Sequence, residues 1–322
     1  MLDRLVRLAL AAVLAFAFGT PVAAQEVTER PIAGFPHAKL YALTGGGPRP
    51  VVVILHGADG GTQAGDRFGP ILAGMGYAAI GLPYYSADWG EYGPPKALPE
   101  LPGSFIDIRI DQIGELREAL AAVDGVDVER FGLFGASKGA EFALIAASRY
   151  DWIDSVVAYS PSDVVWEGWG LEMVEAEGTR SSFSFEGRAL PFVPYRGFVD
   201  GLLAGPAADL RAIHENGRAD HPETVAAARI PVEAYPGSLM LIAGEKDAQW
   251  NAAGAVTRIV ADRAAAGLAT EATVYPDAGH DLVGDGGPRE VGRGGGTPEA
   301  NAAARRDAWP QVEAFLRRTL RP

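Results

Sequence analysis

Short runs of apolar and β-branched residues recur along this 322-residue chain, and several are separated by amphipathic stretches long enough to be helices. The clearest run is Val51-Val52-Val53-Ile54-Leu55, which ends near Gly57 and has the composition of a strand buried on both faces. Similar runs span 77–82, 131–134, 155–159, 239–243 and 272–275, and helices are predicted over 108–123, 140–149, 252–266 and 298–320. Because parallel strands need a crossover and a helix supplies it, the alternation predicts an α/β fold, with a mostly parallel central sheet and helices on both faces.

The alternation of strands and helices breaks between residues 161 and 236, where aromatic residues, Pro, Gly and acidic groups accumulate. We interpret this stretch as an inserted lid over the carboxyl ends of the strands, where open α/β sheets bind ligands. The alternative is a long surface excursion without a function. Further on, the glycine-rich stretch 284–297 predicts a flexible connection.

The first 24 residues have the composition of a signal peptide. Arg4 and Arg7 precede an apolar run over 8–18, and Val22-Ala23-Ala24 supplies small residues before Gln25. Cleavage would leave a mature domain of residues 25–322 with no membrane span and would send it out of the cytoplasm, as a periplasmic or secreted protein. A retained anchor is the alternative, although the run is short for a span, which needs about 20 apolar residues.

Charge and cysteine content exclude several classes of function. The formal net charge of −13 repels phosphate backbones, so nucleic acid is not an expected partner. The chain contains no cysteine, which excludes disulfides, thiolate metal sites and a cysteine nucleophile. The histidines show no metal-ligand spacing, so no metal site is expected either.

The pentapeptide Gly135-Ala136-Ser137-Lys138-Gly139 lies between a predicted strand and a predicted helix. A sharp turn of this kind exposes the serine hydroxyl, and its glycines let the strand and the helix approach closely. The start of the helix also favours negative charge there. Ser137 is therefore the candidate nucleophile, and a serine that only caps the helix is the alternative.

A serine hydroxyl needs a base, and His280 is the best placed of the five histidines. It follows the last predicted strand through Pro276-Asp277-Ala278-Gly279, which suits the chain order of serine, acid and histidine. The remaining alternative for His280 is a solvated loop histidine. His37 precedes the sheet, and His214 and His221 fall within the predicted lid, where surface or lid contacts are expected of them.

The acid that orients the histidine should lie in the loop after the strand at 239–243, which reads Gly244-Glu245-Lys246-Asp247. Asp247 is preferred because it lies deeper in the loop, whereas Glu245 could be a solvated charge beside a lysine. Asp281 is adjacent to the histidine in sequence and is expected to point elsewhere.

An oxyanion formed by attack on a carbonyl group needs two hydrogen-bond donors. The backbone N–H of Lys138 is the first candidate, and the second should come from the turn over 56–61, with Ala58 preferred and Gly57 in reserve. His56 is expected to hold this loop by a hydrogen bond. A nucleotide site is not indicated, because neither the dinucleotide fingerprint nor a Gly-Lys-Ser/Thr ending is present.

Aromatic residues gather after residue 82 and in the predicted lid. Most aromatic side chains belong to cores, so only some of these are expected to line a pocket. The predicted substrate-binding residues are Trp166, Tyr84, Phe192 and Trp250.

Three stretches together resemble a known family: 135–141, then Ala158-Tyr159-Ser160-Pro161-Ser162 with Val165-Trp166, and Leu190-Pro191-Phe192-Val193-Pro194-Tyr195. They resemble the C-terminal domain shared by acyl-CoA thioesterases and bile acid-CoA:amino acid N-acyltransferases, within the α/β-hydrolase superfamily. The resemblance implies the α/β-hydrolase fold and a triad of Ser137, Asp247 and His280. The turn over 56–61 looks more like dienelactone hydrolases. The acyltransferase branch has cysteine where this chain has serine, which favours hydrolysis.

The sequence therefore predicts a serine hydrolase that cleaves a small-molecule carboxylic ester or acyl thioester through an acyl-serine intermediate. This chemistry requires no cofactor. Two alternatives stay open: acyl transfer to an amine or alcohol, and a non-catalytic protein that uses the fold to hold an apolar ligand.

Overall fold

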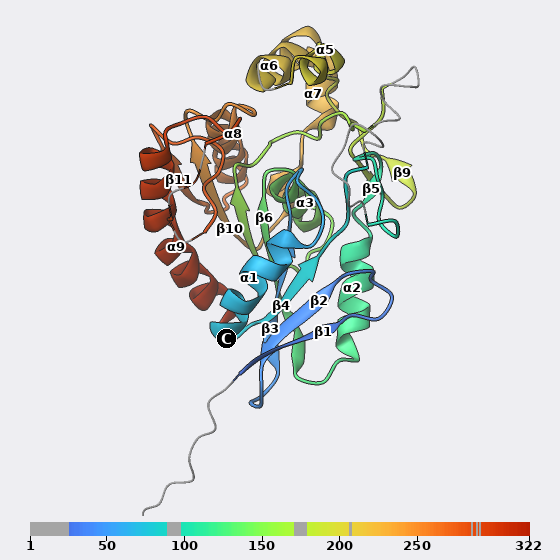
Figure 1. Cartoon of the computed structure of the whole chain (residues 1–322), viewed down its shortest axis with the longest axis vertical. Coiled ribbons are helices and arrows are strands. Elements are labelled where there is room, and N and C mark those ends of the chain that lie inside the picture. Colours follow the sequence, from blue (N-terminus) through green and yellow to red (C-terminus); the bar gives the residue numbers. More distant parts are fainter. Residues whose placement is uncertain are drawn as a thin grey trace, which may run out of the picture.

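A computed structural model describes residues 26–88, 98–170, 179–205, 208–284, 286–287, 289 and 291–322 (Figure 1). The predicted signal peptide, residues 1–24, lies outside the described residues. Along the described part of the chain, no helix combines the length and the hydropathy that crossing a bilayer requires.

An eight-stranded sheet forms the centre of the molecule, in the order β1-β2-β4-β3-β6-β7-β10-β11. The strands are β1 (Val27–Pro31), β2 (Lys39–Leu43), β3 (Arg49–Leu55), β4 (Ala78–Leu82), β6 (Val126–Ala136), β7 (Ser155–Tyr159), β10 (Ser238–Gly244) and β11 (Glu271–Tyr275). The pairs from β4 to β11 are all parallel, whereas β1 and β2 add an antiparallel edge. The predicted α/β class and its mostly parallel sheet are confirmed.

Helices cover both faces of this sheet, as predicted. On one face α2 (Gln112–Ala121), α3 (Lys138–Ala147) and α8 (Ala252–Ala265) pack in the same apolar cluster as Val51 and Val53 of β3. On the other face α1 (Gln63–Gly74) and α9 (Pro298–Leu320) pack with Val52 and Ile54. A strand whose alternate residues enter two cores has no polar face, which explains why β3 is a continuous apolar run.

Two parts of the sequence-based prediction of elements differ from the structure. The helix predicted over 108–123 spans only Gln112–Ala121, because Ile108 and Arg109 form β5 (Ile108–Arg109) and pair with β8 (Phe183–Phe185) in a small sheet completed by β9 (Arg188–Ala189). Ile110 and Ile113 are buried like helix residues, so the apolar spacing conceals the boundary. The antiparallel edge and α1 were not predicted from the sequence.

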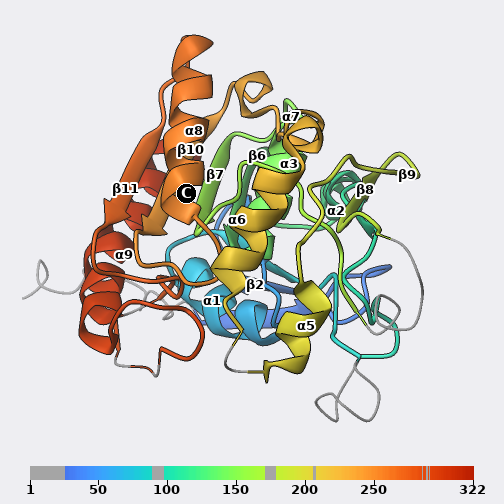
Figure 2. The ribbon, with the colours of Figure 1, turned by 90° about the horizontal axis from the view of Figure 1, so that it is seen from above.

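The segment 161–236 divides into two parts. Its first part contributes β8 and β9 beside β5. Its second part forms α5 (Phe198–Leu203), α6 (Leu210–Asp220) and α7 (Pro222–Ala228), followed by a short 3-10 turn at Val232–Ala234. These helices lie beyond the ends of β6 and β10 at the top of Figure 1, and the view from above places α6 over the middle of the molecule (Figure 2). A role as a lid stays a prediction.

The glycine-rich stretch before α9 is more ordered than predicted. Gly294 accepts hydrogen bonds from the backbone N–H groups of Ala248 and His280, at 3.2 and 2.8 Å, and Gly295 forms an isolated bridge with Asp247. A Cβ on Gly279 would lie 2.0 Å from the carbonyl oxygen of Gly295. For residues 291–297 the prediction of a flexible connection is therefore wrong: glycine is needed here so that two backbones can touch.

Candidate active site

Ser137 lies in a tight turn between β6 and α3. Its φ of 57° and ψ of −123° place a non-glycine residue in a strained region of backbone space. The Ser137 N–H donates to the carbonyl oxygen of Tyr159 on the neighbouring strand at 2.9 Å, and its own carbonyl oxygen accepts from Ala140 and Glu141. The turn is thereby fixed at both ends, by the sheet and by the first turn of the helix.

The two glycines of the pentapeptide are required by the closeness of the neighbouring backbone. A Cβ on Gly135 would lie 2.2 Å from the carbonyl oxygen of Gly139, and a Cβ on Gly139 would lie 2.2 Å from that of Leu55. Only glycine permits this contact between the turn, the helix and β3. The structure thus gives Ser137 the strand, turn and helix setting that the sequence predicts.

His280 and Asp247 meet at the carboxyl end of β10. The His280 Nδ1 lies 2.7 Å from the Asp247 Oδ2, and both side chains are nearly inaccessible to water. The other carboxylate oxygen, Oδ1, accepts from the backbone N–H groups of Gln249 at 2.8 Å and Trp250 at 3.2 Å. A carboxylate can only accept from Nδ1–H, so the Nε2 of neutral His280 keeps a free lone pair.

Burial disfavours the imidazolium form of His280, but the charge and hydrogen bond of Asp247 outweigh burial and raise the pKa of His280 above its ordinary value. Asp247 therefore makes His280 a stronger base. Asp281 lines the same cavity as His280 and Ser137, whereas the Nδ1 of His280 is hydrogen-bonded to Asp247. Burial raises the pKa of Asp281.

The backbone of His280 is held by residues that were not singled out from the sequence. Its N–H donates to the carbonyl oxygen of Gly294 at 2.8 Å, and its carbonyl oxygen accepts from the Ser160 hydroxyl at 2.7 Å. Asn301 of α9 accepts from the Gly279 N–H at 2.7 Å and donates to the Gly295 carbonyl at 3.0 Å. The repeated glycines at 292–296 are the signal of this support in the sequence, although their composition predicts flexibility.

The predicted oxyanion donors lie around Ser137. Lys138 is the first residue of α3, so its backbone N–H has no partner inside the helix. Gly57 and Ala58 line the cavity that contains Ser137, and a Cβ on Gly57 would lie 3.3 Å from the Ser137 Cβ. This places both candidate donor segments next to the hydroxyl, although their catalytic role stays a prediction.

His56 holds the turn over 56–61, which contains the second candidate oxyanion donor, by hydrogen bonds. Its Nδ1 lies 2.8 Å from the Gly57 carbonyl oxygen, and its Nε2 lies 3.2 Å from the backbone nitrogen of Tyr84. A carbonyl oxygen accepts and a backbone N–H donates, so both ring nitrogens are engaged in the neutral form. Burial lowers the pKa of His56, which keeps the ring neutral and leaves it no part as a base.

The Lys138 side chain is buried rather than exposed at the start of its helix. Its Nζ lies 2.7 Å from the Glu141 Oε2 and 2.9 Å from the Ser182 Oγ, among the rings of Phe105 and Phe183. Glu141 also accepts from the Trp166 backbone N–H at 3.1 Å. Burial lowers the pKa of Lys138 and raises that of Glu141. The pair ties the nucleophile turn to the segment after β7.

A cavity of about 440 Å³ opens in front of Ser137, and its lining includes Gly57, Ala58, Gln249 and His280. Phe68 and Phe134 supply apolar wall, while Arg67 and Arg289 add cationic groups beside Asp59 and Asp281. The site is large enough for an acyl group and part of a leaving group.

The predicted substrate-binding residues are distributed differently from the prediction. Trp166 and Trp250 line a second cavity, which does not include Ser137. Tyr84 is a core residue: its ring stacks on His56 and its hydroxyl donates to the His56 carbonyl oxygen at 2.5 Å. Phe192 is half-buried against the main apolar core. Tyr84 is buried in the core, so its assignment to a pocket is corrected here, whereas that of Phe192 stays a prediction.

Residues 117–284, which contain Ser137, Asp247 and His280, match the family described as BAAT / acyl-CoA thioester hydrolase C terminal. The chain belongs to this family. Acyl-coenzyme A thioesterase 2, mitochondrial, of Mus musculus is 27% identical over 305 residues, which cover 88% of this chain and 58% of that protein. Acyl-coenzyme A thioesterase 1 of Rattus norvegicus is 26% identical over 294 residues, covering 88% and 63%. This chain thus spans about three fifths of the length of these relatives.

Solved structures place the chain in the α/β-hydrolase fold. A Klebsiella pneumoniae protein assigned as a dienelactone hydrolase superposes with a TM-score of 0.57 at 16% identity, covering 91% of this chain and 98% of that one. The Pyrococcus horikoshii acylaminoacyl peptidase gives a TM-score of 0.53 at 14% identity, covering 93% and 42%. At these identities the likeness shows the fold, which is the fold predicted from the sequence.

Proposed function

We propose that the protein hydrolyses a carboxylic ester or an acyl thioester, with Ser137 as nucleophile, His280 as base and Asp247 as the acid that orients it. The observation that carries the proposal is the 2.7 Å contact between His280 and Asp247, because His280 lines a cavity that also contains a strained serine at a helix start. Family membership and the names of the thioesterase relatives support the thioester as one substrate class.

The chemistry follows from the arrangement of these groups. The Ser137 Oγ attacks the carbonyl carbon while its proton passes to the His280 Nε2, and the oxyanion accepts from the N–H groups of Lys138 and of Ala58 or Gly57. Collapse of the intermediate breaks the bond to the leaving oxygen or sulfur, which takes the proton from His280. Water then attacks the acyl-serine, with His280 again as base, and releases the acid. Asp247 stays ionised and stabilises the imidazolium in each step.

The test is hydrolysis of p-nitrophenyl esters and of acyl-CoA thioesters of matched chain length, by the wild-type protein and by Ser137→Ala. We expect the substitution to remove turnover and to prevent labelling by a fluorophosphonate. Ser148→Ala, at the far end of α3, is the matched control and should keep both. Labelling of the folded Ser137→Ala protein, or its turnover at the wild-type rate, would disprove the proposed nucleophile. The ratio of ester to thioester rates decides the substrate class.

We propose further that the protein is exported. The support is the basic, apolar and small-residue pattern of residues 1–24. Mass spectrometry of the protein from its native host should find a mature N-terminus at Gln25, in a fraction outside the cytoplasm. An intact Met1 on a cytoplasmic protein would contradict export.

A further inference from the structure

A second cavity, of about 260 Å³, lies among α6, α8 and the residues that follow β7. Trp166, Trp250 and His214 give it aromatic walls. Neither Ser137 nor His280 is part of its lining. The Trp250 ring separates it from the catalytic pair: this ring lines the second cavity and also packs edge-on against the His280 ring, with 5.2 Å between the centroids.

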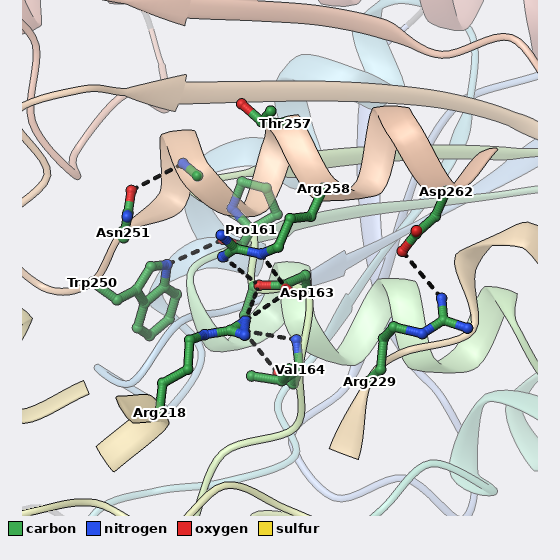
Figure 3. Close-up of polar contacts among 12 residues, drawn as sticks. Pro161, Asp163, Val164, Arg218, Arg229, Trp250, Asn251, Thr257, Arg258 and Asp262 are labelled. Carbon is green, nitrogen blue, oxygen red and sulfur yellow. Dashed lines mark hydrogen bonds and ion pairs between the residues drawn. The ribbon is translucent and has the colours of Figure 1, made fainter. Parts of the chain in front are cut away.

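One wall of the second cavity carries two arginines and the single carboxylate that they share. Asp163 lies between Arg218 and Arg258, which come from α6 and α8 (Figure 3). Arg258 donates to both Asp163 oxygens at 2.7 and 2.9 Å, and Arg218 donates to both at 2.6 Å. The Asp163 side chain is 8% exposed. One carboxylate balances only one of the two guanidinium groups, so the cluster keeps a net charge of about +1.

Two further carboxylates act on Arg258, and each has an arginine partner of its own. Glu215 lines the cavity and lies 3.6 Å from Arg211. Asp262, one helical turn after Arg258, lies 3.1 Å from Arg229. The His214 Nδ1 lies 2.7 Å from the Leu210 carbonyl oxygen, and burial lowers the pKa of His214 to about 4, so this ring is uncharged near neutral pH. In a protein with a net charge of −13, two arginines that share one carboxylate beside aromatic rings are a local exception.

Arg218 and Arg258 each have N–H groups that are not bonded to Asp163. Among the contacts of the described residues, Asp163 engages the Nε and Nη2 of Arg258 and only the Nη2 of Arg218. Each guanidinium carries five N–H donors in a plane, so Nη1 of both residues can bind an anion. Asp163 meanwhile holds the two groups at fixed positions, which lowers the entropy lost on binding.

We propose that this second cavity is a binding site for a small organic monocarboxylate with an aromatic or compact apolar body. The carboxylate would accept a charge-assisted hydrogen bond from the Nη1 of each arginine, and its single negative charge would neutralise the cluster. The apolar body would lie between the indole rings of Trp166 and Trp250. Drug-sized ligands occupy about 300–1,000 Å³, so the occupant is smaller than these.

The test uses sodium 2-naphthoate as the probe and isothermal titration calorimetry on the full chain. We expect one site, and at least tenfold weaker binding by Arg258→Gln and by Ala219→Trp. Ala219 is an exposed residue of α6 that lines the cavity, so a large side chain there blocks the space without removing a buried contact. Arg229→Gln is the matched control, because Arg229 forms comparable ion pairs with Glu233 and Asp262 outside the cavity; its affinity should stay within twofold of wild type.

Two further measurements separate this site from the catalytic cavity and from phosphate binding. Protein carrying a fluorophosphonate on Ser137 should bind the probe as wild type does, and 2-naphthyl phosphate should bind more weakly than the naphthoate. Absence of binding, wild-type affinity in Ala219→Trp, loss of binding in the Ser137 adduct, or tighter binding of the phosphate would each overturn the proposal. If Arg258→Gln does not fold, Ala219→Trp decides.

Discussion

The turn at Ser137 and the helix α6 above it are fixed by different kinds of contact. At the turn, backbone packs on backbone: Gly139 allows the start of α3 to touch β3, and Ser137 bonds to the next strand. At α6 charged side chains add to a smaller set of backbone contacts, such as the close approach of Gly217 to Pro194. Arg218 binds Asp163 after β7, and Arg211 donates at 3.0 Å to the carbonyl oxygens of Glu245 and Asp247.

These two kinds of contact differ in how much movement they allow, so Ser137 is held more exactly than α6. Backbone contacts allow no rearrangement without loss of the fold, which suits a nucleophile that must sit within a few tenths of an ångström of its partners. Side-chain ion pairs that are partly exposed contribute less and can exchange. The positioning of α6 should therefore respond to charge and pH, whereas that of Ser137 should not.

The largest expected effect is that of substituting Asp247, the proposed acid, beside the rigidly held turn at Ser137. In Asp247→Asn the side-chain amide can donate to the His280 Nδ1 and favour the wrong tautomer, so kcat should fall on the order of 10⁴-fold. Asp281→Asn changes a carboxylate that lines the same cavity and should cost less than about tenfold in kcat. Equal losses in the two variants, measured on a p-nitrophenyl ester, would remove the distinction between Asp247 and Asp281.

The same pair sets the expected pH dependence. Hydrolysis needs neutral His280, so kcat/KM should rise with pH through the pKa of His280, which Asp247 raises above the ordinary value of about 6.5. Removing the charge in Asp247→Asn should move this limb of the profile to lower pH. A limb that stays in place in the variant would show that another group controls it.

The third prediction concerns the buried ion pair behind Ser137, the proposed nucleophile. Lys138→Met leaves the Glu141 carboxylate in an apolar site without its partner, which should reduce the free energy of unfolding by about 3–5 kcal/mol. The double variant Lys138→Met/Glu141→Leu should recover part of that loss. Lys39→Met is the control, because the pair of Lys39 with Asp66 is exposed and should be worth at most about 1 kcal/mol. Urea unfolding of the four proteins tests this order.

The same contrast decides what could be predicted from the sequence. The pentapeptide around Ser137 and the strands beside it are local patterns, so the fold and the relative positions of the three triad candidates followed from them. His280 needed only the chain order of the fold. By contrast, Arg218 and Arg258 reach Asp163 from 55 and 95 positions away, and no local pattern announces such contacts. The assignment of Tyr84 to a pocket was wrong for a related reason, since aromatic composition does not say which face of the chain becomes core.

The smallest expected effect is that of weakening the ion pairs that position α6. Asp163→Asn removes the charge between two partly exposed arginines and should lower the free energy of unfolding by about 1–3 kcal/mol. Burial alone would raise the pKa of Asp163, but the two arginines outweigh it and depress that pKa below the ordinary value.

The sign of the pH dependence follows from that depressed pKa. The stability that Asp163 contributes is fully present above its unfolded pKa, near 3.9, and is lost as pH falls through the lower folded value. The difference between wild type and Asp163→Asn should therefore be constant from neutral pH down to about pH 5 and shrink below it. Asp262→Asn, at the exposed pair with Arg229, should show less than about 1 kcal/mol at every pH. If both variants behave alike, the cluster at Asp163 is an ordinary surface ion pair, and α6 is held instead by its apolar contacts.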